Sequence, residues 1–187
     1  MLHQPFTTTL NRIWDHEPCE RGWLTLLEGL AKVRPDDEPL PYSRIVETNG
    51  LKDAVWACRA EPHYDKEWRL FAVQTAKYVE HLFTRPESTR ALIAAELFAH
   101  GRASVEELTY AHRAADEDIA RIPRTGGHQH SAWAAWSATL SEASAAASFT
   151  FGDVSRAVWF ATQGGEERAA TVILLATLTE EFLSLVG

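Results

Sequence analysis

The 187-residue sequence has few cysteines, few basic residues and no apolar run long enough to span a bilayer. Cys19 and Cys58 are its two cysteines, and in a cytosolic chain two thiols are more often reduced, buried apolar side chains than a disulfide. The N-terminus has neither the basic start nor the apolar stretch of a signal peptide. We therefore expect a cytoplasmic chain that does not cross a membrane and keeps both cysteines reduced and buried.

Acidic residues exceed basic residues along the sequence. There are 26 Asp and Glu against 18 Lys and Arg, a net charge of −8, and from Gly101 onward eleven acids face six arginines and no lysine. Clustered lysine and arginine drive the binding of nucleic acid and of anionic lipid. The charge therefore argues against nucleic acid and membrane as partners and favours a basic protein.

Strand patterns are also scarce. Alternating runs rich in Val, Ile and Thr are missing, and no Asn-Gly turn stands between such runs. Apolar residues recur at helical spacing instead. A chain of this length with 45% hydrophobic residues can bury one sizeable core. We predict a single all-α domain over residues 1–187, either a compact multi-helix bundle or a short helical solenoid, with about eight helices.

Helical periodicity is clearest over Asp65–Phe83, where apolar side chains form a continuous stripe. Trp68 lies on this stripe and is expected in the core. All seven tryptophans follow helical patterns, and burial is the ordinary reason for so large a side chain. We expect most of them to be buried, and one or two to anchor a partner, because tryptophan is enriched at interface hot spots.

Other helix boundaries are indicated by capping residues and by composition. Thr84 with Glu87, and Ser104 with Glu107, have the spacing of a capping box, so helices are expected to start near Pro86 and Val105. The alanine-rich run over residues 131–149 predicts one tightly packed helix. Further helices are expected over Thr8–Asp15, around Trp23 to Leu30, over Tyr42–Thr48, from Leu51 onward, and over Thr150–Gln163 and Glu166–Val186.

Two pairs of residues are the candidates for chemistry. His128 and His130 lie two residues apart in Arg124–His130, which we expect to be a flexible loop, and such spacing fits either metal ligands or an exposed loop. His112 and Asp116, one helical turn apart, form either an acid/base or ligand pair or a surface pair that stabilises the helix by roughly 0.2–0.5 kcal/mol. No motif of nucleophilic catalysis accompanies them. We therefore predict no catalytic residue, no metal ligand and no cofactor.

The loop Val33–Pro41 carries the strongest candidates for partner binding. Three consecutive acids lie between its prolines, so their carboxylates should be solvated and open to a basic surface, although a wet loop can be acidic for no other reason. The predicted partner-binding residues are Asp36, Asp37, Glu38, Asp53 and Arg59. As an alternative, Arg59, Arg69 and His81 close the bundle through internal salt bridges.

Five segments in a fixed order identify a related family. They are CERGWLTLLEGLAK (Cys19–Lys32), DDEPLP (Asp36–Pro41), NGLKDAVWACRA (Asn49–Ala60), DKEWRLFAVQTAKYVEHL (Asp65–Leu82) and TRPES (Thr84–Ser88). Over roughly residues 10–110 the chain resembles the family of immunity proteins called immunity protein five-like, found in bacterial and phage genomes. Members commonly continue into a helical tail rich in Ala, Arg and Trp, and residues 131–147 resemble that tail without its arginines. The resemblance implies an all-helical protein that binds and neutralises a cognate toxin.

The leading hypothesis is therefore a non-enzymatic immunity or inhibitor protein that docks an acidic surface onto a toxin or host-defence effector. Electrostatic steering between an acidic inhibitor and a basic target speeds capture. One alternative is a small metal-dependent or acid/base enzyme that uses His112, Asp116, His128 or His130. Another is a self-associating helical module. Metal analysis of the purified protein tests the first alternative, and light scattering tests the second.

Overall fold

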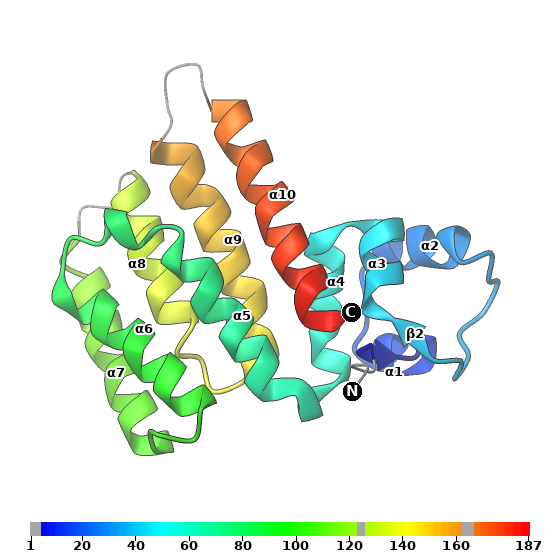
Figure 1. The fold of residues 1–187 in the computed structure, drawn as a ribbon, viewed down its shortest axis with the longest axis horizontal. Helices are drawn as coiled ribbons and strands as arrows, with labels where there is room; N and C mark the ends of the chain where they lie inside the picture. Colours follow the sequence, from blue (N-terminus) through cyan, green and yellow to red (C-terminus); the bar gives the residue numbers. More distant parts are fainter. Residues whose placement is uncertain (1–4, 123–125, 162–166) are drawn as a thin grey trace. The chain divides into compact units, whose positions relative to one another are not determined.

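The computed structural model describes residues 5–122, 126–161 and 167–187, with side chains described from residue 170 in the last range. These residues form ten α-helices, three short 3-10 segments and one pair of two-residue strands (Figure 1). The prediction of an all-α protein is confirmed, with ten helices in the described residues where about eight were expected. The helices are α1 (Leu10–Trp14), α2 (Glu20–Gly29), α3 (Tyr42–Asn49), α4 (Leu51–Ala57), α5 (Asp65–Lys77), α6 (Pro86–Ala99), α7 (Val105–Ile119), α8 (Gly127–Ser137), α9 (Ala143–Ala161) and α10 (Glu167–Val186).

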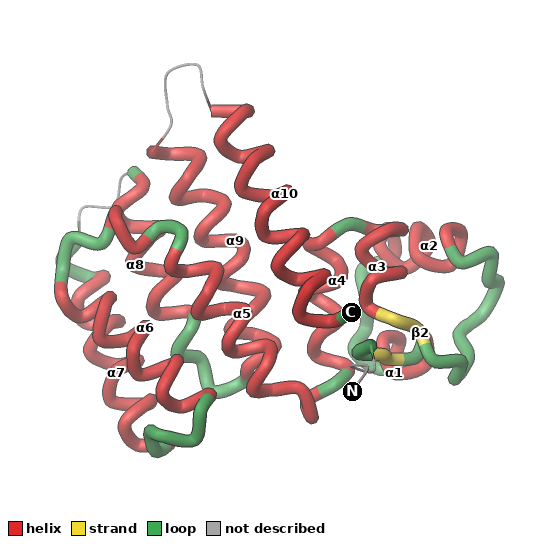
Figure 2. Tube along the Cα trace, viewed as in Figure 1, coloured by secondary structure: helices red, strands yellow, loops and turns green. Residues whose placement is uncertain are grey.

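The chain divides into two compact units. Unit 1 comprises Met1–Pro62 and Ala176–Gly187, and unit 2 comprises His63–Leu175, so the division falls within α10. Helix dominates both units, as the tube in Figure 2 shows. The single domain expected from chain length stays a prediction. In the described parts of the chain, no helix has both the length and the apolar character needed to cross a membrane.

Unit 1 contains the strands, β1 (Thr7–Thr8) and β2 (Leu40–Pro41), which pair antiparallel. Leu40–Pro41 was expected to be loop, and this part of the prediction is wrong. Phe6 and Leu40 are buried beside the pair, and the Phe6 amide donates to the Val186 carbonyl at 2.8 Å. The last residues of α10 and the first residues of the chain are therefore joined within unit 1.

Helices α2, α3 and α4 pack in sequence order in unit 1. The predicted break between α3 and α4 is confirmed: Gly50 has φ +82°, a conformation that side chains rarely adopt. The Tyr42 ring is fully buried, its hydroxyl donates to the Ala57 carbonyl at 3.0 Å, and it meets Phe182 of α10 edge-on at 6.3 Å. One aromatic side chain thus connects α3, α4 and α10.

Unit 2 is organised around α5, which packs against α6, α8 and α9. Trp68 is fully buried, as predicted, and Phe71 and Ala72 are also buried farther along the same stripe. The helix ends at Lys77, however, and a separate 3-10 turn follows over Glu80–Leu82. The predicted helix was therefore six residues too long, because apolar residues continue at helical spacing past its end.

The two predicted capping boxes had different outcomes. Ser104 and Glu107 form a capping box at the start of α7, with reciprocal bonds of 3.2 and 2.7 Å between side chain and backbone. Helix α6 begins with Pro86 in its first turn, so the cap position falls on Arg85 and Thr84 lies outside the helix. Proline fits the first turn because no helical partner is needed for its missing N–H. The predicted helix start near Pro86 is confirmed, but the predicted capping box of Thr84 with Glu87 is wrong for this reason.

The alanine-rich region forms two helices, α8 and α9, where one was predicted. Helix α8 also begins earlier than expected, at Gly127, so the second half of the predicted loop Arg124–His130 is helical; residues 124–125 lie outside the described residues. Gly126 has φ +96° at the helix start. A Cβ on Gly127 would lie 3.0 Å from the Ala157 carbonyl oxygen. The glycine pair therefore permits a tight helix start against α9.

Candidate functional site

The predicted acidic residues lie in the long helix-free connection between α2 and β2 (Figure 2). Lys32 donates to Asp36 at 2.5 Å and also to Glu38. Its hydrogen bond to Asp36 is the largest cause that lowers the pKa of that carboxyl group. Asp37 and Glu38 are exposed, and the Glu38 side chain retains 76% of its accessible surface. Two of the three acids therefore already have an intramolecular cation, and Asp37 and Glu38 project most into solvent.

Helix α1 holds this loop in place. The Asn11 amide donates to the Asp36 carbonyl at 3.1 Å, and Asp37 is close enough to Arg12 to help raise the pKa of that guanidinium. The main cause of the raised Arg12 pKa is its hydrogen bond to Glu61, a fully buried carboxylate, at 2.5 Å. The acidic loop therefore lies beside α1 and next to a buried ion pair.

Trp14, at the end of α1, is the exposed aromatic residue of this region. Its side chain is 51% exposed, and its ring packs against Trp23 of α2 with centroids 5.0 Å apart and planes at 43°. Trp23 is 7% exposed. Trp14 is one helical turn from Asn11, the residue that binds the acidic loop. A half-exposed apolar ring, packed on Trp23, is thus carried by the same short helix that binds the backbone of the acidic loop.

The other two predicted binding residues have structural contacts elsewhere. Asp53 accepts from the Asn49 side chain at 2.9 Å, and Asn49 also donates to the Gly22 carbonyl at 2.8 Å. Arg59 donates to the Trp56 carbonyl at 2.8 Å and lies 4.2 Å from the centre of the Trp56 ring. These contacts order α2, α3 and α4, and none of them involves the acidic loop.

The tryptophans are less buried than expected. Trp23 and Trp68 are buried, Trp14 and Trp159 are largely exposed, and the other three are intermediate. The prediction that most of them are buried is therefore wrong.

The cysteine prediction holds in part, because both thiols are free but only Cys58 is buried. Burial raises the pKa of the Cys58 thiol, whereas exposed Cys19 caps α2 by accepting from the Gly22 amide.

His112 and Asp116 are more than a surface pair. His112 is half-buried, its Nδ1 lies 2.9 Å from the Thr139 hydroxyl, and its ring packs on Trp136 at 4.6 Å. Desolvation lowers the pKa of the imidazole, and Asp116 opposes this shift. The interaction with Asp116 is thus secondary to packing between α7 and the end of α8.

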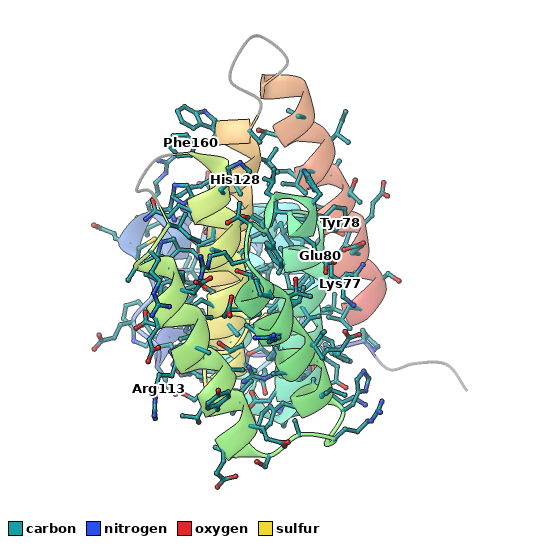
Figure 3. The ribbon with its side chains drawn as sticks, turned by 90° about the vertical axis from the view of Figure 1, so that its left-hand side faces the viewer. Lys77, Tyr78, Glu80, Arg113, His128 and Phe160 are labelled. Atoms are coloured by element: carbon teal, nitrogen blue, oxygen red, sulfur yellow. The ribbon has the colours of Figure 1, made fainter. Side chains whose placement is uncertain are left out.

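His128 and His130 are helical residues of α8 and do not lie in an exposed loop. His128 Nδ1 is 2.8 Å from the Leu82 carbonyl, and the His130 ring stacks on Phe160 at 5.0 Å with an interplanar angle of 10°. His128 and Phe160 lie at the same end of the helices in Figure 3. Within the described ranges, no group of three or more His, Cys, Asp or Glu side chains converges as metal ligands would.

A serine, an aspartate and a histidine also line α8 and α9. Ser137 donates to Asp153 at 2.9 Å, and burial raises the pKa of Asp153. His130 is seven residues before Ser137 on the same helix, a separation of about 10 Å at 1.5 Å per residue. A base must lie within hydrogen-bond reach of the hydroxyl that it deprotonates. These three residues therefore do not form a nucleophilic relay.

Two of the three side chains that were expected to form internal salt bridges, Arg69 and His81, are placed otherwise in the described residues. Buried Arg69 donates to two carbonyl oxygens and not to a carboxylate, and His81 is exposed. The carboxylates buried in ion pairs are Glu61, paired with Arg12, and Asp118, paired with Arg85. Each of these pairs joins residues far apart in sequence. No pattern of local spacing indicates them.

Comparisons of the chain with protein-family models, with curated proteins and with solved structures found no match.

Proposed function

We propose that this chain is a non-enzymatic immunity or inhibitor protein, and that it neutralises a basic toxin or effector through a surface formed by Trp14, Asp36, Asp37 and Glu38. We call this the Trp14–loop surface. The observation that carries the proposal is the half-exposed Trp14 ring, which packs on Trp23 and belongs to the helix whose Asn11 amide binds the acidic loop at Asp36. Interface hot spots typically combine such an aromatic anchor with a charged rim.

The distribution of charge supports a basic partner for unit 1. Its residues include twelve acids and seven bases, a net charge of −5, whereas unit 2 has fourteen acids and eleven bases, a net charge of −3; together these give the −8 of the chain. Unit 1 is also the smaller unit. A negative field of this kind accelerates encounter with a positively charged protein and weakens as salt is added.

Lys32 and Arg12 limit how much of this charge a partner meets. Lys32 binds Asp36 and Glu38, and Arg12 binds Glu61, so Asp37 and the mostly exposed Glu38 should supply most of the local attraction. We expect Trp14 to provide affinity and the two exposed acids to provide speed of association. The resemblance to immunity proteins over roughly residues 10–110 agrees with this division, because the Trp14–loop surface lies within that segment.

The test uses the purified product of a toxin gene next to the gene of this chain, which the proposal expects to exist. Replacing Asp36, Asp37 and Glu38 by Asn, Asn and Gln should slow association and weaken its dependence on salt, as measured by stopped-flow kinetics. The melting temperature should barely change, because exposed ion pairs contribute only about 0–1 kcal/mol. Trp14→Ala should raise the dissociation constant by roughly thirtyfold, about 2 kcal/mol.

A matched control separates local docking from net charge. Replacing Glu80, Glu106 and Glu117 by Gln changes the net charge equally, but these exposed acids lie in unit 2. The control should slow association less than the loop variant does. Equal effects would mean that only the total charge matters. A loop variant with a sharply lowered melting temperature and an unchanged association rate would show that these acids stabilise the fold and do not meet the partner.

A further inference from the structure

Helix α8 packs closely against its neighbours in unit 2. It contacts α5, α6, α7 and α9, and the approach to α9 is so close that a methyl group at Gly127 would lie 3.0 Å from the Ala157 carbonyl oxygen. Two imidazole rings lie at its two ends. His130, in its first turn, meets α9, while His112, on α7, meets its last turn. Both rings are only partly exposed.

At the C-terminal end, hydrogen bonds fix the tautomer of His112. The Thr139 hydroxyl donates its single proton to the Trp136 carbonyl at 2.6 Å, because two oxygens so close need a proton between them. The same hydroxyl lies 2.9 Å from His112 Nδ1, so Nδ1 must carry a hydrogen and donate it. Neutral His112 therefore has its lone pair on Nε2, and any added proton must bind there.

At the N-terminal end, His130 is held by packing alone. Its ring lies nearly parallel to that of Phe160. Its Nδ1 is buried and has no hydrogen-bond partner in the part of the chain that the structure describes. An uncharged ring fits this position, since a buried group without a partner is far more costly when it is charged. Figure 3 shows Phe160 and the neighbouring His128 at this end of α8.

Two charged side chains act on these rings. Asp116, on α7, favours the protonated form of His112, and Arg156, on α9, disfavours that of His130. In both histidines desolvation is the largest cause, and it lowers the pKa below the ordinary value of 6.5. From α8 itself, the Trp136 carbonyl also favours the protonated form of His112, less strongly than desolvation opposes it, and the Trp136 ring does not titrate. His128 donates to the Leu82 carbonyl, a bond that its protonated form can also make.

We propose that α8 is an acid-sensitive latch: it packs firmly in unit 2 while His112 and His130 are neutral, and it loosens when they take up protons. The two contacts lie at opposite ends of one eleven-residue helix. Protonation would place a positive charge in the aromatic stack at one end and next to Trp136 at the other. The device belongs to unit 2 and is independent of the Trp14–loop surface.

The direction of the pH dependence follows from the lowered pKa values. In the opened state both imidazoles bind protons near their ordinary pKa of about 6.5, whereas the packed state resists protonation. The packing is therefore fully stable above about pH 7.5 and weakens as the pH falls through 6.5. At pH 5.5, linkage allows the opening constant to rise by up to about tenfold for each histidine, and so up to about a hundredfold for both.

Native-state hydrogen exchange of the α8 amides tests the proposal. After correction for the intrinsic pH dependence of exchange, the α8 amides should lose protection between pH 7.5 and 5.5, while those at the centre of α5 should keep theirs. The double variant His112→Gln with His130→Leu should abolish this loss, because Gln can still donate to Thr139 and Leu can still pack on Phe160. Single variants should each remove part of it.

The control is His100→Gln, since His100 is exposed after α6 and outside these contacts. It should leave the exchange of α8 at pH 5.5 as in the unaltered protein. A second measurement does not depend on any variant: the ring protons of His112 and His130 should titrate in nuclear magnetic resonance spectra with midpoints below 6.5. Midpoints at or above 6.5, or α8 protection that is equal at the two pH values, would overturn the proposal.

Discussion

Replacing Arg69 by Met should destabilise unit 2, and the structure allows the cost to be worked out. Arg69 is 2% exposed, and its two terminal nitrogens donate to the carbonyls of Ala138 and Ser141 at 3.0 and 2.9 Å. Both carbonyls lie in the turn that joins α8 to α9, and the guanidinium also lies 5.1 Å from the centre of the Phe98 ring. One side chain on α5 therefore fixes the reversal between two other helices.

The size of this destabilisation depends on which carbonyl groups lose their hydrogen-bond partner in the Met variant. Ala138 is fully buried, so its carbonyl would lose its partner without gaining water, at a cost of about 1–3 kcal/mol. Ser141 is exposed, and its carbonyl can rebind water at a smaller cost. Loss of the contact with the Phe98 ring adds about 0.5–1 kcal/mol. Met avoids the desolvation of a cation, which burial disfavours strongly enough to lower the Arg69 pKa. We expect a net loss of about 2–4 kcal/mol.

Urea denaturation, combined with hydrogen exchange of the amides around Ala138 to Glu142, measures this loss. Arg69→Lys is the matched variant, because it keeps the charge but lacks the planar fork that reaches two carbonyls at once. The free energy of unfolding of Arg69→Lys should lie between that of Arg69→Met and that of the unaltered protein. If Arg69→Met is as stable as the unaltered protein, or more stable, then the desolvation cost of the guanidinium outweighs its two hydrogen bonds and Arg69 does not stabilise the turn.

Three further substitutions test the packing. Trp68→Ala should destabilise by roughly 3–5 kcal/mol in denaturant titration, since Trp68 is fully buried on the stripe of α5; an unchanged midpoint would contradict that placement. Gly127→Ala and Gly152→Ala should act in opposite directions in thermal melts. A methyl group at Gly152 has only the Arg156 side chain near it, at 3.8 Å, and should stabilise α9 by about 0.5–1 kcal/mol, whereas at Gly127 it meets the Ala157 backbone at 3.0 Å and should destabilise. Stabilisation by both would mean that α8 and α9 can move apart at no cost.

The elements that the sequence predicted well depend on local rules. Helix α7 and its cap, Ser104, contain the cap, the first turn and the buried stripe within sixteen residues, and the break between α3 and α4 needs one glycine with positive φ. Each of these sequence patterns involves residues within one or two helical turns, which is the range over which residue spacing predicts structure. Such elements can be read from sequence because their neighbours along the chain determine them.

The errors arose where residues distant in sequence decide the structure. Strand β2 exists because β1, more than thirty residues earlier, pairs with it. Gly126 and Gly127 were predicted to lie in a loop, yet Gly127 begins α8, where the Ala157 carbonyl of α9 lies close to it. The pair Arg12 and Glu61 joins positions 49 residues apart. The acidic loop was correctly placed as mostly helix-free, but its contacts with Asn11 and Arg12 could not be foreseen.

Trp14 shows how this limit affects the candidate site. Leu10, Ile13 and Trp14 occupy positions i, i+3 and i+4, a pattern that predicts one buried face, and Leu10 and Ile13 are indeed buried. Trp14 is the last residue of a five-residue helix, and Trp23 covers only part of its ring. Half of a tryptophan therefore remains in water, where its apolar surface gains nothing from folding. Binding a partner would bury that surface, and for this reason Trp14, more than any of the acids, is the residue on which the proposed interface depends.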